Sequence, residues 1–447
     1  MEAALATIHL GDTRLDKRCN VLIDQFMKRP TMSIPEACGS WKSTKAAYRF
    51  FTNDAVSAEK ILQAQYQQTR QRIKETNGIV LVAQDTTDID YTTHLRTQGL
   101  GYLQGEKQFG IKMHSALAIS QSGIPLGLLA QKRWIRDIAE FGKRRMPGKE
   151  KRPIEEKETN RWLTTVKEIE ARLPQTKEAV IIGDREADLY ELFALKRKAN
   201  VHLLVRAKHN RYLWGVKKRL FAKVLETDSV GTLTITVQKT PHRRIHQVNL
   251  MVRFTQVTLA SKYGKGAIRL FVVVAEEEKP PQGVQPIRWI LLTTVPVTTC
   301  TKAVEVINWY TKRWLIERFH YTLKSGCKIE GLQLQERDRL ERAIAVYTIV
   351  AWRLLWIIYE SREYPEGNVS RILTKEEWDV LCTVSKKKKE VPKTIHEGVM
   401  MIAKLGGFLA RKGDKEPGVK TLWIGIRRFT DIMQGWKMAQ QKDVGKG

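Results

Sequence analysis

The chain has few cysteines and few acidic residues, and it has no long apolar segment free of charge. Its 5 cysteines form no Cys-x-x-Cys pair, so they predict neither a zinc site nor a disulfide framework and indicate the reduced thiols of a cytoplasmic protein. The longest apolar stretch, residues 343–359, includes Arg353 and is shorter than a typical membrane span, so we expect a buried helix there. The sequence also shows no signal segment and no lipidation motif, so we expect no membrane partner.

The shortage of acidic residues leaves a large positive charge. The sequence has 77 Lys and Arg against 48 Asp and Glu, which gives a formal net charge of +29. An excess of this size favours a polyanionic partner, and nucleic acid is the commonest one. The alternative is a basic surface that is merely solvated and has no specific partner. With 447 residues, 42% of them hydrophobic, the chain can form two or three domains.

The order of apolar segments predicts an α/β fold. Residues 1 to about 70 have helical patterns, and later segments read as consecutive strands followed by alternating helices and strands. This order favours an α/β sheet with an antiparallel edge. The predicted strands are 78–84, 113–119, 124–134, 179–183 and 201–207, the predicted helices are 154–173, 186–198, about 302–325 and about 337–362, and a β-rich insertion covers about 212–298.

Three acidic residues stand in settings suited to a metal site. Asp85 and Asp184 each follow an apolar run, and Glu317 lies on the predicted helix 302–325. Carboxylates at strand ends and on a facing helix can converge, and such a group binds Mg²⁺ or Mn²⁺ for phosphoryl transfer. Because a single Asp at a strand end is more often a turn residue, the prediction depends on all three acids together.

The same predicted helix carries other polar groups beside Glu317. If the helix is continuous, Tyr310, Arg313, Glu317 and Lys324 fall within an arc of roughly 60°, at about 100° per residue. Cations on this face would bind phosphates, and an arginine can do so with two hydrogen bonds. A pair with Arg313 could by itself explain Glu317, but it does not explain four polar residues on one face.

Several neighbouring polar residues are expected to have structural roles. Asp188, one turn after Asp184, is expected to cap a helix or to pair with a nearby base. Asp88 and Asp90 are expected in a polar turn, and Thr86 is expected to satisfy local backbone groups.

These motifs carry a family resemblance. The segments QDTT (84–87), GDREAD (183–188) and Tyr-x₂-Arg-x₃-Glu-x₆-Lys (310–324) resemble, in order and spacing, those of DDE transposases of the Tn-five type, within the insertion-sequence-four family. The resemblance extends over nearly the whole chain. LGDTR (10–14) and AAYRFF (46–51) are similar to the N-terminal end-binding domain of that family, and MIAKLGGF (401–408) is similar to its C-terminal dimerisation segment.

The resemblance implies a ribonuclease-H-like catalytic domain with a β-rich insertion, between two helical regions. The implied division is a transposon-end DNA-binding domain at 1–70, a catalytic domain at 71–362 with its insertion at about 212–298, and a dimerisation region at 363–447. In the catalytic domain, the resemblance implies a catalytic and metal-binding triad of Asp85, Asp184 and Glu317. The implied cofactor is Mg²⁺, with Mn²⁺ able to substitute.

The resemblance also implies residues that contact DNA. Arg206, in LLVRAK, matches a family arginine near the active site, and Trp289, in IRWILLTT, matches a family tryptophan that stacks with a flipped base near the transposon end. From its own setting Trp289 would be interpreted as a core residue, but a flipped base does need an aromatic partner. Tyr310, Arg313 and Lys324 are expected to position phosphates.

The implied activity is cut-and-paste transposition of DNA. A homodimer would cleave the transposon ends through a DNA hairpin, each subunit cutting the end held by its partner, and would join them to target DNA. The protein would act in the bacterial cytoplasm, bound to the nucleoid with its DNA. One alternative is a catalytically inactive DNA-binding regulator or inhibitor of transposition, against which the three acids argue. The other is a ribonuclease-H-like nuclease without strand transfer, against which the terminal modules argue.

Overall fold

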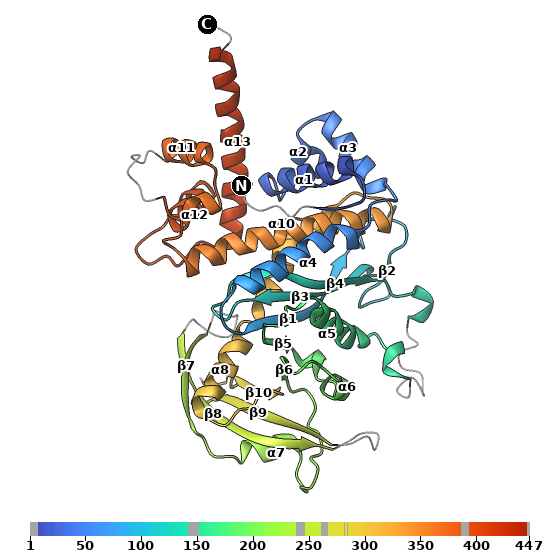
Figure 1. Ribbon diagram of the computed structural model, residues 1–447, viewed down its shortest axis with the longest axis vertical. Helices are drawn as coiled ribbons and strands as arrows, with labels where there is room; N and C mark the ends of the chain where they lie inside the picture. Colours follow the sequence, from blue (N-terminus) through green and yellow to red (C-terminus); the bar gives the residue numbers. More distant parts are fainter. Residues whose placement is uncertain are drawn as a thin grey trace.

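Helices from both ends of the chain pack on one side of a long helix, and a mixed sheet lies on the opposite side of that helix (Figure 1). The computed structural model describes residues 8–141, 152–237, 246–260, 267–280, 282–283, 285–385 and 393–444.

The N-terminal helices each begin behind a polar side chain that caps the first turn. They are α1 (Thr13–Lys28), α2 (Ile34–Cys38), α3 (Trp41–Thr52) and α4 (Ala58–Glu75), capped by Asp12, Ser33, Ser40 and Ser57. Such caps bond N–H groups that the helix itself leaves unpaired. The last of these helices, α4, packs on the sheet and on the long helix α10, so the expected domain boundary near residue 70 falls inside an element that belongs to the sheet layer.

One mixed sheet runs through the middle of the protein, with the order β2-β3-β1-β5-β6-β10-β9-β8-β7 and with β4 paired to β3. Its antiparallel edge is β4–β3–β1, and β1, β5 and β6 are parallel. The strands are β1 (Val80–Asp90), β2 (Gly101–Tyr102), β3 (Phe109–Ile119), β4 (Pro125–Trp134), β5 (Ala179–Gly183), β6 (Val201–Arg206), β7 (Gly231–Val237), β8 (His246–Leu259), β9 (Ile268–Glu277) and β10 (Arg288–Thr293).

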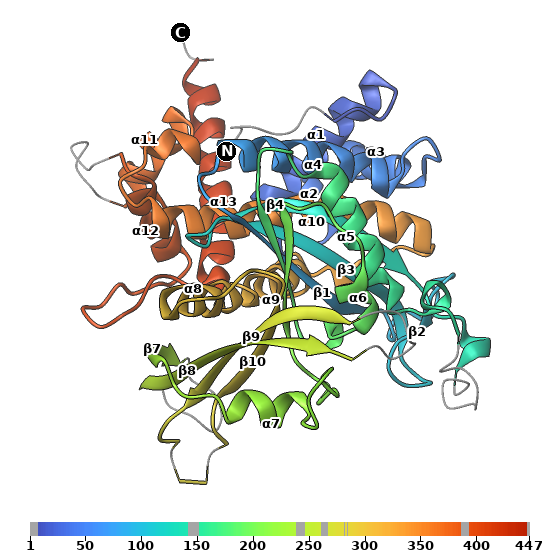
Figure 2. The same cartoon turned by 60° about the horizontal axis from the view of Figure 1, so that its bottom comes forward.

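This arrangement confirms the expected α/β class with its ribonuclease-H-like core and β-rich insertion. The insertion is not a separate layer, because β10 pairs antiparallel with β6 and so extends the same sheet (Figure 2). The central strands separate two apolar cores. Leu81 and Ala83 of β1 face the core that includes α10, and Val80 and Val82 face the core that includes α5. Alternation along a strand explains this division.

The remaining helices cover the sheet and form the C-terminal region. They are α5 (Asn160–Arg172), α6 (Tyr190–Ala194), α7 (Leu220–Leu225), α8 (Cys300–Thr311), α9 (Trp314–Tyr321), α10 (Arg337–Glu363), α11 (Lys375–Val384), α12 (Ile395–Leu405) and α13 (Val419–Val444). By length and composition α10 could cross a membrane, but 89% of its most apolar window is buried inside the protein, as the sequence predicts for a core helix.

Three predicted boundaries are wrong. Strand β1 continues to Asp90, so Asp88 and Asp90 lie on a strand and not in a turn, because antiparallel pairing with β3 persists beyond the end of β5. The predicted helix 186–198 is a 3₁₀ turn followed by the short α6, because the buried Asp188 leaves the helical path to bond the chain after β6.

The predicted helix 302–325 is also interrupted. It ends as α8 at Thr311, restarts as α9 at Trp314 and closes in a π-helical turn at Thr322–Gly326. At the interruption, the amides of Leu315 and Ile316 bond carbonyls three residues back, at Lys312 and Arg313, and these tighter bonds shift the helical phase. The prediction that Tyr310, Arg313, Glu317 and Lys324 share one face of a continuous helix is therefore wrong in its geometry.

The C-terminal helices α12 and α13 approach each other through glycine. A Cβ added at Gly425 of α13 would lie 1.9 Å from the carbonyl oxygen of Ile402, and one added at Gly406 would lie 1.8 Å from that of Thr421. Backbone therefore touches backbone at this crossing, and no side chain fits between the two helices.

We predict that Gly425→Ala destabilises the α12–α13 pair, because the new methyl group must push the helices apart. Overpacking of this kind typically costs about 1–3 kcal/mol. Gly435→Ala is the matched control on the same helix, since a Cβ there meets no atom within 4 Å. It should be neutral or should stabilise the helix by roughly 0.5–1 kcal/mol. Thermal unfolding measures both, and equal effects would contradict the close approach.

Candidate active site

Asp85 and Asp184 lie side by side on neighbouring parallel strands. The last paired residues of β1 and β5 are Ala83 and Ile182, and each acid comes two residues later. Residues at matching positions of parallel strands point to the same face. Asp85 is half-buried inside β1, and Asp184 caps the turn after β5 by accepting a hydrogen bond from the amide of Glu186 at 2.8 Å.

Arg206 continues this row across the sheet. Gly183 pairs with Val205, so Arg206 on β6 stands beside Asp184. On its other side, Arg206 pairs with Leu291 of β10, and its guanidinium donates to the carbonyl of Arg288 at 3.1 Å. The sheet register thus places two carboxylates and a guanidinium in one row.

Tyr310, Arg313 and Glu317 meet at the junction of α8 and α9 although the helix is interrupted there. Arg313 donates to a carboxylate oxygen of the exposed Glu317, and its guanidinium lies 6.0 Å from the ring centroid of Tyr310. The Tyr310 ring contacts Trp289 edge to face, with 5.7 Å between centroids. Trp289 is half-buried at the start of β10 and lines a hollow with Arg206.

Electrostatic coupling joins these two groups into one site. Burial raises the pKa of Asp85 to about 7, against the effect of a hydrogen bond from the amide of Thr86. The carboxylates of Asp184 and Glu317 raise this pKa further, and the charge of Arg313 lowers it. Burial also raises the pKa of Tyr310, which the charges of Arg313 and Arg206 oppose. The three predicted acids, Arg206 and Arg313 therefore lie within electrostatic range of one another, although they come from four separate elements.

The acids offer the oxygen donors that Mg²⁺ or Mn²⁺ prefers. In the part of the chain that the structure describes, however, no three acidic, His or Cys side chains are gathered closely enough to hold a metal ion. Glu317 is paired with Arg313. The donor set fits a hard divalent cation, and Glu317 would have to exchange its partner to complete the set.

Lys324 lies beside this cluster and not within it. Its ammonium donates to the carbonyl of Asp88 at 2.8 Å and pairs with Glu330 at 2.9 Å. Asp88 is three residues beyond Asp85 on β1, about 10 Å along the strand, so Lys324 contacts the strand that carries Asp85 but lies outside the row of acids. Lys328 is exposed and adopts a left-handed backbone conformation with φ of 47°, so it is not the continuation of a helix.

Asp188 has the structural role that the sequence predicts. Its buried carboxylate accepts from the amides of Lys208 and His209 at 2.7 and 2.8 Å and pairs with Arg211. These bonds fix the chain where it leaves β6, immediately after Arg206.

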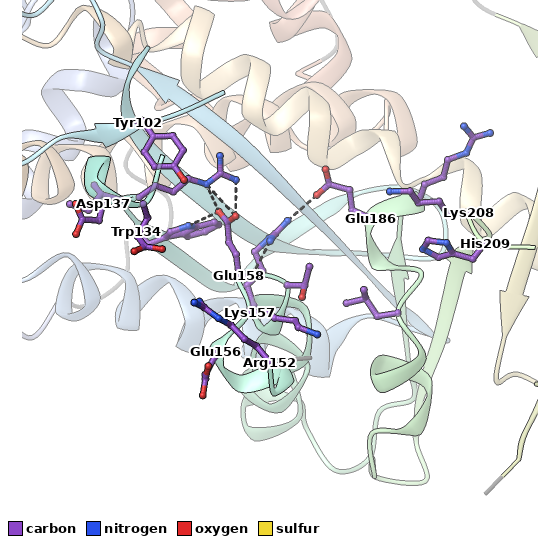
Figure 3. Close-up of a pocket in the computed structure, with 17 residues that line it drawn as sticks. Tyr102, Trp134, Asp137, Arg152, Glu156, Lys157, Glu158, Glu186, Lys208 and His209 are labelled. Carbon is purple, nitrogen blue, oxygen red and sulfur yellow. Dashed lines mark hydrogen bonds and ion pairs between the residues drawn. The ribbon is translucent and has the colours of Figure 1, made fainter. Parts of the chain in front are cut away.

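Arg161 of α5 ties together the two segments that carry the acids, and the sequence analysis missed it. Its Nε donates to Thr86 Oγ1 at 2.9 Å, and its Nη2 donates to Glu186 Oε2 at 2.9 Å. Thr86 follows Asp85, and the amide of Glu186 bonds Asp184. Figure 3 shows Glu186 in the hollow that Lys208 and His209 also line.

His114 on β3 completes a buried hydrogen-bond chain behind the site. Its Nε2 lies 3.0 Å from Gln84 Oε1 and its Nδ1 lies 2.8 Å from Thr86 Oγ1. Because an amide oxygen only accepts, Nε2 carries the proton, so Thr86 donates to Nδ1 and accepts from Arg161. Burial and the charge of Arg161 hold the pKa of His114 well below its usual value, so the ring is neutral. The signal in the sequence was a titratable residue within the otherwise mostly apolar run 113–119.

Three family models match the chain. A model described as Transposase DNA-binding matches residues 1–56, one described as Transposase DDE domain matches residues 153–353, and one described as Transposase Tn5 dimerisation domain matches residues 349–444. Together they define a transposase with a DNA-binding domain, a DDE domain and a dimerisation domain. The chain belongs to the Tn5-like DDE transposases.

A solved structure is also similar to the chain, the cryo-EM structure of a piggyBac transposase synaptic complex with hairpin DNA. It shares 10% identity with a TM-score of 0.34, over 88% of this chain and 72% of that one. A similarity at this level says nothing of the activity of this chain.

We predict that Thr86→Val destabilises the protein by about 1–3 kcal/mol, because it leaves a buried acceptor on His114 and a donor on Arg161 unpaired. Thr86→Ser is the matched control, since it keeps the hydroxyl and should recover most of the loss. Urea unfolding at neutral pH measures the difference. Equal stability of the two variants would show that this hydrogen-bond chain contributes little.

Proposed function

We propose that this chain is a cut-and-paste transposase that hydrolyses phosphodiesters at transposon ends with Mg²⁺ and joins the ends to target DNA. The observation that carries the proposal is the row of Asp85, Asp184 and Arg206, electrostatically coupled to Arg313 and Glu317, in a member of this family. Mg²⁺ or Mn²⁺ would be held by Asp85, Asp184 and Glu317. When bound, the metal supplies Lewis acidity that activates water and stabilises the oxygens of the transferring phosphate.

The carboxylates account for the metal dependence of the proposed reaction. Burial and neighbouring negative charge make ionised Asp85 unfavourable without a counter-ion, as its raised pKa indicates. A divalent cation would remove that repulsion. Glu317 would move from Arg313 to the cation, and Arg313 would then be free to bind a phosphate oxygen.

The cations and the phenol would position the DNA. Arg313 and Arg206 both interact with Tyr310 beside the acids, so they can contact the scissile and neighbouring phosphates while Tyr310 holds their geometry. Lys324 would contact a phosphate near Asp88. Trp289 would stack with an unpaired base, and its edge contact with Tyr310 would hold the ring in place.

The proposed chemistry proceeds by successive in-line displacements at phosphorus. Water would attack the phosphodiester at the transposon end, and the 3′-oxygen would leave and take up a proton. That 3′-hydroxyl would attack a phosphodiester of the opposite strand to form a hairpin, and the 3′-oxygen of the flanking DNA would leave with the proton. Water would then open the hairpin by displacing the 3′-oxygen of the transposon end. The released 3′-hydroxyl would attack a phosphodiester of target DNA, whose own 3′-oxygen would leave.

Synapsis and domain organisation complete the proposal. A homodimer would hold two transposon ends, and each subunit would cleave the end bound by its partner. The N-terminal helices to about residue 70 would bind the ends, residues 71–362 would carry the chemistry, and residues 363–447 would dimerise. The site of action would be the nucleoid in the bacterial cytoplasm.

We predict that Asp85→Ala, Asp184→Ala and Glu317→Ala each abolish cleavage but keep most of the affinity for DNA, because phosphate contacts supply that affinity. The loss should exceed the roughly 10–100-fold that follows removal of an outer-shell partner of a metal. The assay incubates the protein with the DNA that flanks its own gene and Mg²⁺, and follows hairpin and joined products. Asp228→Ala, an exposed acid before β7, is the control.

Two outcomes would contradict parts of this proposal. Cleavage at a near wild-type rate in one of the three variants would remove that residue from the triad. Cleaved ends without joined products would indicate a nuclease without strand transfer.

We also predict that Lys324→Ala lowers single-turnover cleavage more than Lys328→Ala, because Lys324 stands beside β1 near the acids whereas Lys328 is exposed outside any regular helix. Both variants lose one positive charge, so general affinity for DNA should fall equally. A similar cleavage defect in the two variants would exclude Lys324 from the site.

A further inference from the structure

Two large aromatic side chains stand in solvent on the segment of chain that leads away from Arg206. Tyr212 is 65% exposed and Trp214 is 66% exposed, and Val216 beside them is 45% exposed. They lie in the segment 207–219 between β6 and α7, which we call the aromatic hairpin. Single exposed apolar residues are ordinary, but a cluster of large ones usually marks an interaction surface.

Backbone hydrogen bonds hold the side chains of Tyr212 and Trp214 pointing into solvent. Leu213, between them, is 7% exposed and forms a bridge with Leu259 at the end of β8. The amide of Trp214 donates to the backbone carbonyl of Thr258 at 2.8 Å, and the backbone carbonyl of Tyr212 accepts from the amide of Ala260 at 3.2 Å. Because neighbouring residues of an extended segment point to opposite sides, an inward Leu213 forces Tyr212 and Trp214 outward together.

The aromatic hairpin is rich in basic residues, and one of them contacts the Tyr212 ring. The guanidinium of Arg219 lies 4.3 Å from the ring centroid of Tyr212 and donates to its hydroxyl at 2.6 Å. Residues 208–219 contain no acid and include the basic residues Lys208, Arg211, Lys217, Lys218 and Arg219. A surface of planar rings and positive charge is complementary to nucleic acid, whose bases stack and whose phosphates are negative.

The aromatic hairpin is continuous with the candidate active site. It starts directly after Arg206, and the bonds from Asp188 to Lys208, His209 and Arg211 hold its base in place. Lys208 lines both hollows beside the site, including the one that Arg206 and Trp289 line. A DNA strand that extends from a phosphate near Asp184 past Lys208 would therefore run toward the surface that Tyr212 and Trp214 form.

From this placement we infer that the aromatic hairpin stacks with unpaired bases of the DNA strand that extends from the site beyond the scissile phosphate. The occupant is a single strand because the faces of bases inside a duplex are covered by their neighbours, whereas an unpaired base exposes both. The inference rests on the proposed function, since it requires DNA at Asp85 and Asp184. It concerns Tyr212 and Trp214 and is separate from the role of Trp289.

The test compares two DNA probes for the full-length protein. One is a blunt duplex that ends at the scissile position, and the other carries a short single-stranded extension beyond it with 2-aminopurine as a fluorescent base. The variant is Tyr212→Ala with Trp214→Ala. The control is Tyr364→Ala, a 52% exposed aromatic residue after α10. Because the replaced side chains are exposed, the variants should fold normally, and thermal unfolding checks this.

We expect the double variant to lose affinity for the extended probe only. The double variant should bind the extension roughly 5- to 150-fold more weakly for each stacked base, and should lose the quenching of 2-aminopurine. Its affinity for the blunt duplex should equal that of the wild type. Lys217→Ala should instead lower the dependence of affinity on salt, by a slope of about 0.7 for a contact to a single strand.

Other outcomes overturn the inference in distinguishable ways. If the wild type cleaves DNA and the double variant binds both probes as the wild type does, the inference is wrong and the proposed function stands. Equal losses on both probes would also overturn it, because the rings would then contact duplex. If the wild type binds neither probe, the proposed function fails together with the inference.

Discussion

The burial of α10 is the constraint on which the rest of the structure depends. This helix is apolar around most of its circumference, and a helix of that kind is stable only when other elements cover every side. The N-terminal helices, α4, strand β4 and the C-terminal helices supply that cover. At one contact, the ring of Tyr347 stacks on Phe26 of α1 with 4.5 Å between centroids. The three regions matched by family models are therefore joined through one shared core.

The candidate active site depends on a balance between the buried carboxylate of Asp85 and the charged groups around it. Asp85 lies on a central strand, where burial makes its ionised form unfavourable. The negative charges of Asp184 and Glu317 add to this cost, and the positive charge of Arg313 reduces it. The buried hydrogen-bond chain behind the site is neutral at His114 and ends at the charged Arg161. A buried hydrogen-bond chain behind the acids and a partly exposed Arg313–Glu317 ion pair in front of them suit the proposed binding of metal and phosphate.

The sequence was informative wherever the pattern of one segment decided its structure. The apolar runs before Asp85 and Asp184 indicated adjacent strands, and the parallel register then aligned the two acids. The family motifs selected Arg206 and Trp289, which local patterns alone would have left as ordinary strand residues. The structure lays these residues around one cluster.

The features that could not be predicted depend on contacts between distant segments. Strand β1 extends to Asp90 because β3 pairs with it, and no pattern within residues 86–90 indicates that partner. The interruption between α8 and α9 changes the helical phase without a proline or glycine to signal it. Arg161 reaches Thr86 across 75 residues of sequence, so its role exists only in the folded protein.

The packing of α1 against α13 has a consequence for how the chain is made. Arg29 donates to Asp431 at 2.7 Å and to Gln434 at 2.9 Å, and the hydroxyl of Thr430 donates to the carbonyl of Lys28 at 3.0 Å. Arg29 and Asp431 are 402 residues apart. At a synthesis rate of about 5–20 residues per second, the end of α1 waits roughly 20–80 s for this partner. During that interval α1 exposes a surface that the finished protein covers.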